Sequence, residues 1–176
     1  MILENQEILL RTPTPKDKDD VWSYRQEFID LNENISGGGG LLKTNTYDEW
    51  LQKLENASSP KTLPKGKVPV TQFLTIRKQD NKLVGVVNVR HYLNDVLLIH
   101  GGHIGDSVRP SERKNGYGTM QIGLAIKYLK SIGTNKILIT CNKDNEASRK
   151  TIINNGGQLE NEINYEGETI QRFWIN

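Results

Sequence analysis

The 176-residue sequence lacks the features of several specialised protein classes. Its single cysteine, Cys141, excludes an internal disulfide and an all-cysteine metal site, and it favours a reducing compartment. No apolar stretch approaches the ~20 residues needed to span a bilayer. The N-terminus has no basic segment followed by a long apolar run, so we expect no signal peptide. These absences predict a cytoplasmic protein that does not cross a membrane.

The charge balance is also unspecialised. The chain has 23 Lys and Arg residues against 21 Asp and Glu residues, a formal net charge of +2. The cations are spread along the chain without a basic run, so we expect no nucleic-acid partner. No cluster of His, Cys and carboxylates has metal-ligand spacing, so we expect no metal. The length fits one domain over residues 1–176.

The stretch 103–130 organises the rest of the sequence. A short strand is predicted at 103–108, followed by a loop at 113–118 with two glycines and two cations. From Thr119 the period changes to that of a helix. The apolar residues that recur at three- and four-residue steps are Met120, Ile122, Leu124, Ala125, Tyr128, Leu129 and Ile132. The predicted order is therefore strand, glycine-rich turn, helix.

A strand, a glycine-rich turn and a helix in this order can form an anion-binding site. The first N–H groups of a helix have no partner inside the helix, and its dipole adds partial positive charge there. Glycine allows close backbone approach, and Arg113 and Lys114 add full charge. A phosphate fits such a place. The alternative is an ordinary strand-to-helix turn without a ligand. The loop is neither a Walker A sequence nor a GxGxxG motif.

The other segments predict a mixed α/β fold. The turn after Lys78 joins two strands as a hairpin, and Gly85 indicates a bulge or a close backbone approach. Gly37–Gly40 favours a flexible loop, and the alternative is a mobile wall of a substrate site. We expect strands at 6–12, 70–78, 83–93, 135–140, 158–165 and 169–175, and helices at 15–31, 47–56 and 145–155. Together they predict a mixed sheet with helices on both faces.

Two segments resemble the GCN5-related N-acetyltransferases, the GNAT superfamily. The loop 113–118 matches the R/Q-x-x-G-x-G/A signature of that family, and 141–157 is similar to its next strand end and helix. The likeness covers residues 70–176 well, and residues 1–69 match in their pattern of elements. The resemblance implies the GNAT fold and an N-acetyltransferase. Such an enzyme moves an acetyl group from acetyl-CoA directly to a primary amine of a small molecule or protein.

The resemblance also implies a cofactor site. The strand end at Ser107 and Val108 would offer backbone groups to the pantetheine and the reaction oxyanion, and the following turn would hold the pyrophosphate. Asn142 and Asn145 would contact the pantetheine side, or they would only form turns and caps. The turn residues are Arg113, Lys114, Asn115, Gly116, Tyr117, Gly118 and Thr119. Homodimers are frequent in the superfamily, and the terminal hairpin offers an edge for one.

Asp106 and His103 are the candidate catalytic residues. Histidine has the better unperturbed pKa for a base at neutral pH, whereas Asp106 would bind and position a cationic amine. They alternate on a strand, so they share a pocket only if the strand bulges. The alternative for each is a structural polar residue. His91 and His100 are weaker candidates. The tyrosine that many GNAT enzymes use as acid is replaced by Ile152 here.

Two other functions remain open from the sequence. A non-catalytic acyl-CoA-binding or regulatory domain would keep the loop 113–118 and lose the chemistry, and the missing tyrosine favours it. A phosphotransferase would need Mg²⁺ carboxylates and a P-loop lysine near the loop, and the sequence has neither. Detectable turnover separates the first from an enzyme, and a preference for ATP over acetyl-CoA would support the second.

Overall fold

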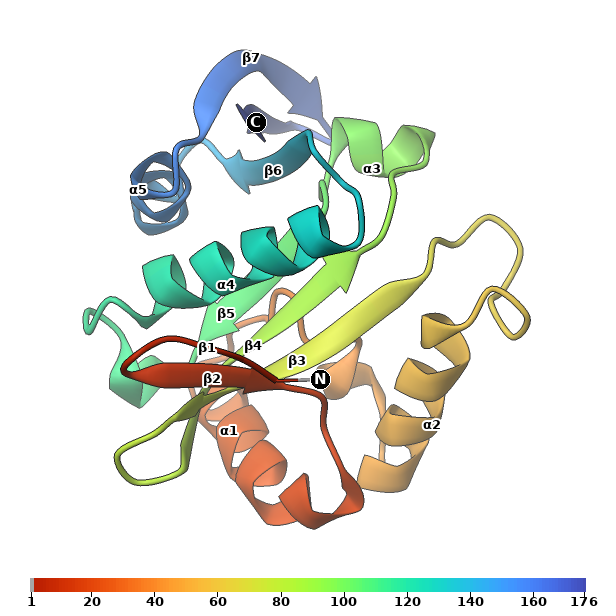
Figure 1. The fold of residues 1–176 in the computed structure, drawn as a ribbon, viewed down its shortest axis with the longest axis vertical. Coiled ribbons are helices and arrows are strands. Elements are labelled where there is room, and N and C mark those ends of the chain that lie inside the picture. The colour runs from red at the N-terminus through yellow and green to blue at the C-terminus, as the bar shows by residue number, and fades with distance from the viewer. Residues whose placement is uncertain (1) are drawn as a thin grey trace.

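The computed structural model of the chain describes residues 2–176, which form two antiparallel sheets surrounded by helices (Figure 1). The larger sheet has five strands and the smaller has three. The larger runs in the order β1 (Ile2–Glu4), β2 (Ile8–Arg11), β3 (Val70–Arg77), β4 (Lys82–Arg90) and β5 (Ile104–Val108). The smaller runs in the order β6 (Ile137–Asn142), β8 (Glu168–Ile175) and β7 (Gln158–Tyr165).

Helices cover both faces of the larger sheet, as the sequence predicts. In Figure 1, α1 and α2 lie below the sheet and α4 crosses above it, between the two sheets. The helices are α1 (Lys18–Asp30), α2 (Tyr47–Ser58), α3 (Asp95–Ile99), α4 (Tyr117–Ser131) and α5 (Glu146–Asn154). Single turns of 3₁₀ helix, η1 (Pro15–Asp17), η2 (Leu41–Lys43) and η3 (Pro110–Glu112), lie between them.

The central strands are buried on both faces, which explains their long apolar runs. Phe73 and Val87 pack in one core with Leu129 of α4. Their neighbours Leu74 and Val86 point the other way and pack in a second core with residues of α1 and α2. Because side chains alternate along a strand, each strand supplies both cores. Each core buries apolar surface, which favours this layered arrangement over the unfolded chain.

Most predicted elements are present, with small shifts of their ends. The bulge suggested by Gly85 is confirmed, because Thr75 pairs with Gly85 and Ile76 with Leu83, so β4 has an extra residue there. One strand and one α-helix were not predicted. The strand β1 has three residues, and the Asn5 side chain accepts N–H bonds in the turn that follows it. The helix α3 is a single turn capped by Asn94.

The Gly37–Gly40 segment is packed and hydrogen-bonded, so the flexible loop favoured from the sequence is wrong. The Gln72 amide donates to the Gly37 carbonyl at 2.9 Å, and the Trp50 indole donates to the Gly38 carbonyl at 2.9 Å. Both donor residues are buried. Gly37 has φ +67° and lies against Gly105 of β5, so a Cβ there would be 2.0 Å from the Gly105 oxygen. Glycine is needed here for close approach.

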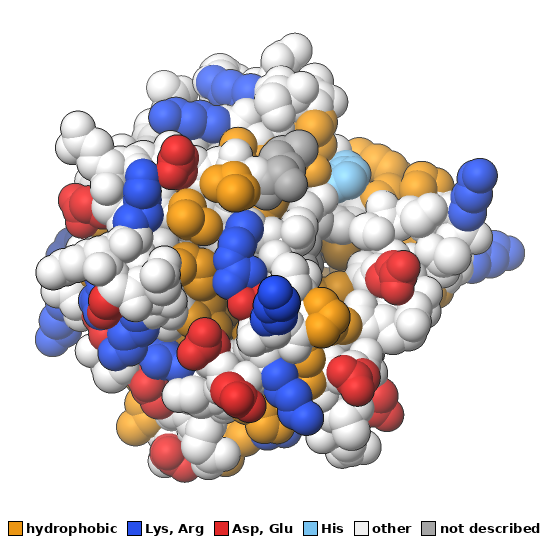
Figure 2. All heavy atoms as spheres, turned by 60° about the horizontal axis from the view of Figure 1, so that its bottom comes forward, with side chains coloured by type: hydrophobic (Ala, Val, Ile, Leu, Met, Phe, Trp, Pro, Cys, Tyr) orange, Lys and Arg blue, Asp and Glu red, His pale blue; other side chains and the backbone are white. Residues whose placement is uncertain are grey.

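The surface carries charges of both signs. On the face in Figure 2, basic and acidic side chains are interspersed, with hydrophobic side chains between them. Within residues 2–176, no helix is both long and apolar enough to cross a bilayer. No group of three or more His, Cys, Asp and Glu side chains in that range is arranged to hold a metal ion.

Candidate active site

The candidate site is the cleft where β5 and β6, the facing edges of the two sheets, separate. At one end the strands meet, because the His103 N–H donates to the Leu138 carbonyl at 2.7 Å. Beyond that point the two strands form no ladder. A cavity of about 710 Å³ opens between them, lined by residues of β5 and β6 and by the first turns of α4 and α5. This volume is typical of small-molecule sites.

The loop after β5 brings the free backbone of α4 to this cavity. Lys114 and Gly116 both have left-handed backbones, with φ of +68° and +81°, and Gly116 caps the helix. A Cβ on Gly118 would lie 3.5 Å from Thr151 and 3.6 Å from Val108, so its absence leaves that space open. The free N–H groups and the helix dipole therefore face a space that an anion can enter.

Arg113 and Lys114 both line the cavity, and Arg113 is held by Glu33. Its guanidinium forms a two-pronged ion pair with the Glu33 carboxylate and lies over the Phe28 ring, 5.7 Å from the centroid. The hydrogen bond from Arg113 lowers the pKa of Glu33. Both side chains are about two-fifths exposed, at 42% and 40%, so the pair is open to exchange with a ligand anion. The sequence did not predict the Glu33 contact.

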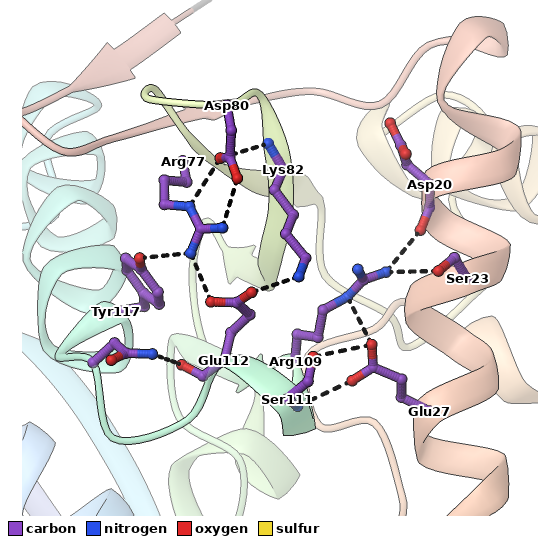
Figure 3. A network of polar contacts seen from close by, with 11 residues as sticks. Asp20, Ser23, Glu27, Arg77, Asp80, Lys82, Arg109, Ser111, Glu112 and Tyr117 are labelled. Carbon is purple, nitrogen blue, oxygen red and sulfur yellow. Dashed lines mark hydrogen bonds and ion pairs between the residues drawn. The ribbon is translucent and has the colours of Figure 1, made fainter.

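Two loop residues support the site in different ways. Asn115 does not line the cavity, and its side chain donates to the Glu112 carbonyl at 3.1 Å, which stabilises the loop. Tyr117 lines the cavity, and its hydroxyl accepts a bond from Arg77 at 3.1 Å. Figure 3 shows Glu112 at the centre of these contacts, with Arg77 and Lys82 on its carboxylate. The loop is thereby tied to the β3–β4 hairpin.

The backbone N–H and C=O groups of β5 point alternately toward β4 and toward the cleft. The Arg90 N–H donates to His103 O, and the Arg109 N–H donates to Val84 O. Pairing with β4 therefore falls on the odd-numbered residues of β5, including Ser107. The N–H groups of Asp106 and Val108 point away from β4, toward the cleft. Of the predicted oxyanion donors, Val108 is free and Ser107 is engaged.

Asp106 is half-buried at the cavity wall and points toward α4. Its carboxylate accepts a 2.7 Å bond from the Gln121 amide, whose oxygen accepts a 2.7 Å bond from Thr75. Burial raises the pKa of Asp106 to about 6, and the Gln121 bond opposes that rise. The carboxylate is thus ionised at neutral pH yet more basic than an ordinary aspartate. Gly85 makes room, because a Cβ there would lie 2.3 Å from the Gln121 oxygen.

His103 lies at the closed end of the cleft and is not among the residues that line the cavity. Its Nδ1 accepts a 2.9 Å bond from the Leu138 N–H, and the side chain is buried. The β4–β5 register is unbroken from Ile104 to Val108, so the bulge that would bring His103 and Asp106 together does not exist. The geometry therefore gives His103 a structural contact and leaves Asp106 as the carboxylate at the cavity.

The remaining predicted residues lie at the far end of the cleft. Thr119, Asn142 and Asn145 all line the cavity. The Asn145 side chain accepts from the Ser148 N–H at 3.0 Å, so it caps α5, and the Asn142 side chain accepts from the Asp144 N–H at 3.3 Å. Ile152 is fully buried in the core, and it is not among the residues that line the cavity.

The two remaining histidines occupy different places. His91 lies away from the cavity, with its ring nitrogen 2.8 Å from the Thr71 hydroxyl, and burial lowers its pKa. His100 lines the cavity and stacks on Tyr165, with ring centroids 5.1 Å apart. Neither ring is paired with Asp106.

Several residues that line the cavity were not predicted from the sequence. Ser36 lies beside β5, where its carbonyl accepts the Ser107 hydroxyl at 2.8 Å. Cys141, Ser148 and Thr151 bring a thiol and two hydroxyls to the α5 side. Burial raises the pKa of the Cys141 thiol. Gln121, which bonds to Asp106 and does not itself line the cavity, had a detectable signal, because it is a polar residue on the apolar face of the predicted helix.

Two antiparallel sheets that separate between β5 and β6, with the glycine-capped N-terminus of α4 at the cleft, make up the candidate site. Residues 7–158 match the family described as the acetyltransferase (GNAT) domain. The chain belongs to this family. A search of curated proteins found no match.

Solved structures share the fold at low identity. An acetyltransferase of the GNAT family from Bacillus anthracis is 19% identical with a TM-score of 0.67, covering 99% of this chain and 98% of that one. RimL, a ribosomal L7/L12 alpha-N-protein acetyltransferase in complex with coenzyme A, is 15% identical with a TM-score of 0.72, covering 99% and 97%. The microcin C7 self-immunity acetyltransferase MccE, in complex with acetyl-CoA and AMP, is 18% identical with a TM-score of 0.66, covering 97% and 93%.

Proposed function

We propose that the chain is an N-acetyltransferase that uses acetyl-CoA and transfers the acetyl group directly to a primary amine of a small molecule or protein. The cleft between β5 and β6, with the α4 N-terminus at its mouth, carries this proposal. Similar structures hold coenzyme A or acetyl-CoA, which supports the choice of co-substrate. One similar protein is described as acting on a ribosomal protein, so a protein amine is one acceptor class to test.

The residues present fit a CoA thioester. The α4 N-terminus, with left-handed Lys114 and Gly116, suits a pyrophosphate, and the space beside Gly118 would be filled by any Cβ. Arg113 can exchange its Glu33 partner for a phosphate oxygen, because guanidinium groups bind both in the same two-pronged way. Bound acetyl-CoA would supply the activated acetyl group.

The chain would supply orientation, oxyanion stabilisation and a proton acceptor. The Val108 N–H faces the cleft and can donate to a developing oxyanion. The Asp106 carboxylate can bind the incoming ammonium and take one of its protons, which frees the nitrogen lone pair to attack the acetyl carbon. Its raised pKa suits this role better than that of an exposed aspartate. As the carbon–sulfur bond breaks, the thiolate can leave without an acid, since thiols are moderately acidic, and the second nitrogen proton passes to the released thiolate or to water.

The direct test is release of free thiol from acetyl-CoA in the presence of a panel of acceptors. The panel contains polyamines, amino acids, aminoglycosides and peptides with free N-termini, each paired with its N-acetylated form as a control. We expect turnover with at least one free amine and none with its blocked form. Asp106→Asn should lower kcat by about 10²–10⁴-fold. Binding of acetyl-CoA without turnover on any amine would favour the non-catalytic alternative.

A further inference from the structure

The two sheets are joined at the closed end of the cleft by a small set of contacts that we call the vertex: Gly101–His103 against Leu138 and Thr140. The His103 N–H donates to the Leu138 carbonyl at 2.7 Å, and the Leu138 N–H donates back to His103 Nδ1 at 2.9 Å. The Gly101 N–H donates to the Thr140 hydroxyl at 2.9 Å. Beyond the vertex, β5 and β6 share no ladder within the described residues 2–176.

The vertex explains why the strands separate there. In a parallel ladder, the Leu138 N–H would donate to the carbonyl of Gly101. That carbonyl instead accepts the Arg90 guanidinium at 2.7 Å, and the His103 ring takes the Leu138 N–H. A side-chain acceptor thus replaces the backbone acceptor on the closed side of that bond. On the open side, the His103 carbonyl would accept from the Thr140 N–H in a continuing ladder, but it accepts the Arg90 N–H of β4 at 2.8 Å, so the ladder ends after one backbone bond. Beyond this point, the free backbone groups of β5 face the cleft rather than β6.

The close fit of the vertex leaves little freedom. A Cβ on Gly102 would lie 2.5 Å from the Leu138 oxygen, so the two backbones are already in contact. Leu138 is fully buried and His103 is 5% exposed. Without the His103 acceptor, the Leu138 N–H would be a buried donor with no partner, and the strands would shift to bring it water or another acceptor.

We propose that His103 is a positioning residue, which fixes the vertex and thereby sets the spacing of β5 and β6 that admits the CoA thioester. This inference rests on the proposed function. It develops the structural alternative that the sequence left open for His103, in place of the candidate role as catalytic base. His103 acts at the end of the cleft, through Leu138, and touches none of the reacting atoms.

The hydrogen bond from the Leu138 N–H requires one protonation state of the His103 ring. Because Nδ1 accepts, the proton of the neutral ring is on Nε2, and a doubly protonated ring could not accept the Leu138 N–H. Burial, with the nearby Arg90 charge from β4, lowers the pKa of His103 and favours the neutral ring. Leu138, which contacts the ring from β6, is uncharged. The vertex should therefore hold at neutral pH and weaken in acid.

The test compares His103→Asn with His103→Leu. Asparagine offers Oδ1 at the place of Nδ1, whereas leucine fills the space without an acceptor. We would measure the Kd of CoA by calorimetry and the KM for acetyl-CoA. Loss of one hydrogen bond predicts about tenfold weaker CoA binding by His103→Leu, with His103→Asn within about threefold of the wild type. At saturating acetyl-CoA, kcat should stay within about threefold in both.

Two results would overturn the proposal. One is a fall in kcat of about 10²-fold or more in His103→Asn with unchanged CoA affinity, because that is the behaviour of a catalytic base. The other is equal CoA affinity in all three proteins.

Two further outcomes are a His103→Leu variant that does not fold and a wild type that binds no CoA. If His103→Leu does not fold, CoA affinity is compared from pH 8 to pH 5 in the wild type and His103→Asn. The proposal requires a greater loss in acid for the wild type, and equal losses would contradict it. If the wild type binds no CoA, the proposed function fails, and this inference fails with it.

Discussion

At the scale of single residues, Asp106 links the chemistry of the site to the stability of the fold. Burial raises its pKa from 3.8 to about 6. A raised carboxyl pKa means that the fold favours the neutral form. The stabilising effect is therefore complete below about pH 4 and is lost as the pH rises through about 6. Catalysis needs the ionised form, so stability and activity make opposite demands on this side chain.

Two pH dependences follow for Asp106. The acid limb of kcat/KM should fall with an apparent pKa near 6. Asp106→Asn keeps an oxygen to accept from Gln121 and removes the buried charge. We expect it to be more stable than the wild type by about 1–3 kcal/mol at pH 8, with little difference near pH 4. Thermal unfolding at both pH values checks this. A less stable variant at pH 8 would contradict the assignment of Asp106 as a buried charge.

At the scale of elements, the first glycine of the segment Gly37–Gly40 packs against Gly105 of β5. Gly37→Ala would put a Cβ 2.0 Å from the Gly105 oxygen and would also strain a backbone with φ +67°. Gly66→Ala is a matched control, since its φ is +80° and nothing lies within 4 Å of the added Cβ. We expect about 1–2 kcal/mol of destabilisation for Gly66→Ala, from the left-handed backbone alone.

Gly37→Ala should destabilise the protein more than Gly66→Ala does. It should also raise the KM for acetyl-CoA, because it displaces β5 at the cleft. The measurements are thermal unfolding and steady-state kinetics on both variants. Equal destabilisation with unchanged KM would show that the contact with Gly105 does not position β5.

The ion pairs of Glu112 tie the loop 113–118 to the β3–β4 hairpin (Figure 3). Glu112 is buried and accepts from Lys82 at 2.5 Å and Arg77 at 2.6 Å. Both hydrogen bonds lower the pKa of the Glu112 carboxyl, and the bond from Lys82 has the larger effect. A lowered carboxyl pKa contributes stability above the ordinary pKa of about 4.5, and this is lost as the pH falls through the folded value.

Glu112→Ala should destabilise the protein by about 1–3 kcal/mol at pH 7, because it leaves two cations without their shared acceptor. It should also weaken acetyl-CoA binding, since the loop would lose its anchor. The control is Glu4→Ala, which removes an exposed pair with Lys78 and should change stability by less than about 0.5 kcal/mol. Similar effects of the two variants in urea unfolding would show that the network does not anchor the loop.

The sequence predicted the elements with strong local signals and missed those that depend on distant contacts. The helix after Thr119 follows from its apolar period and the turn before it from its two glycines, and both are present. The packing of Gly37 depends on Gln72 and Trp50, which are far away in the chain. Four consecutive glycines carry no sign of such partners, so flexibility was the natural and wrong prediction.

In the candidate site, too, the residues placed by local sequence were predicted and those placed by distant contacts were not. Asp106 and the turn residues other than Asn115 reach the cavity as expected, because a strand end followed by a glycine turn places them locally. The position of His103 was set by Leu138 of another sheet, and no local pattern reveals a ring nitrogen that accepts from a backbone N–H. Gln121 reaches Asp106 only because Gly85, on a different strand, leaves room for its amide.

At the scale of the whole molecule, the site exists because two sheets meet at one vertex and part beyond it. The larger sheet, covered by α1, α2 and α4, presents β5, and the smaller sheet presents β6 (Figure 1). A ligand that bridges the two sheets in the cleft would add contacts that the unfolded chain cannot make. Its binding should therefore stabilise the whole fold.

The most direct test of the central claim is thermal unfolding with and without acetyl-CoA. At about 100 times its Kd, a ligand bound only by the folded state adds roughly 2.7 kcal/mol. We predict a clear rise in Tm for the wild type. The rise should be lost in Gly118→Val, whose side chain would enter the space between Val108 and Thr151. An unchanged Tm of the wild type with acetyl-CoA and with CoA would contradict the cleft as an acyl-CoA site.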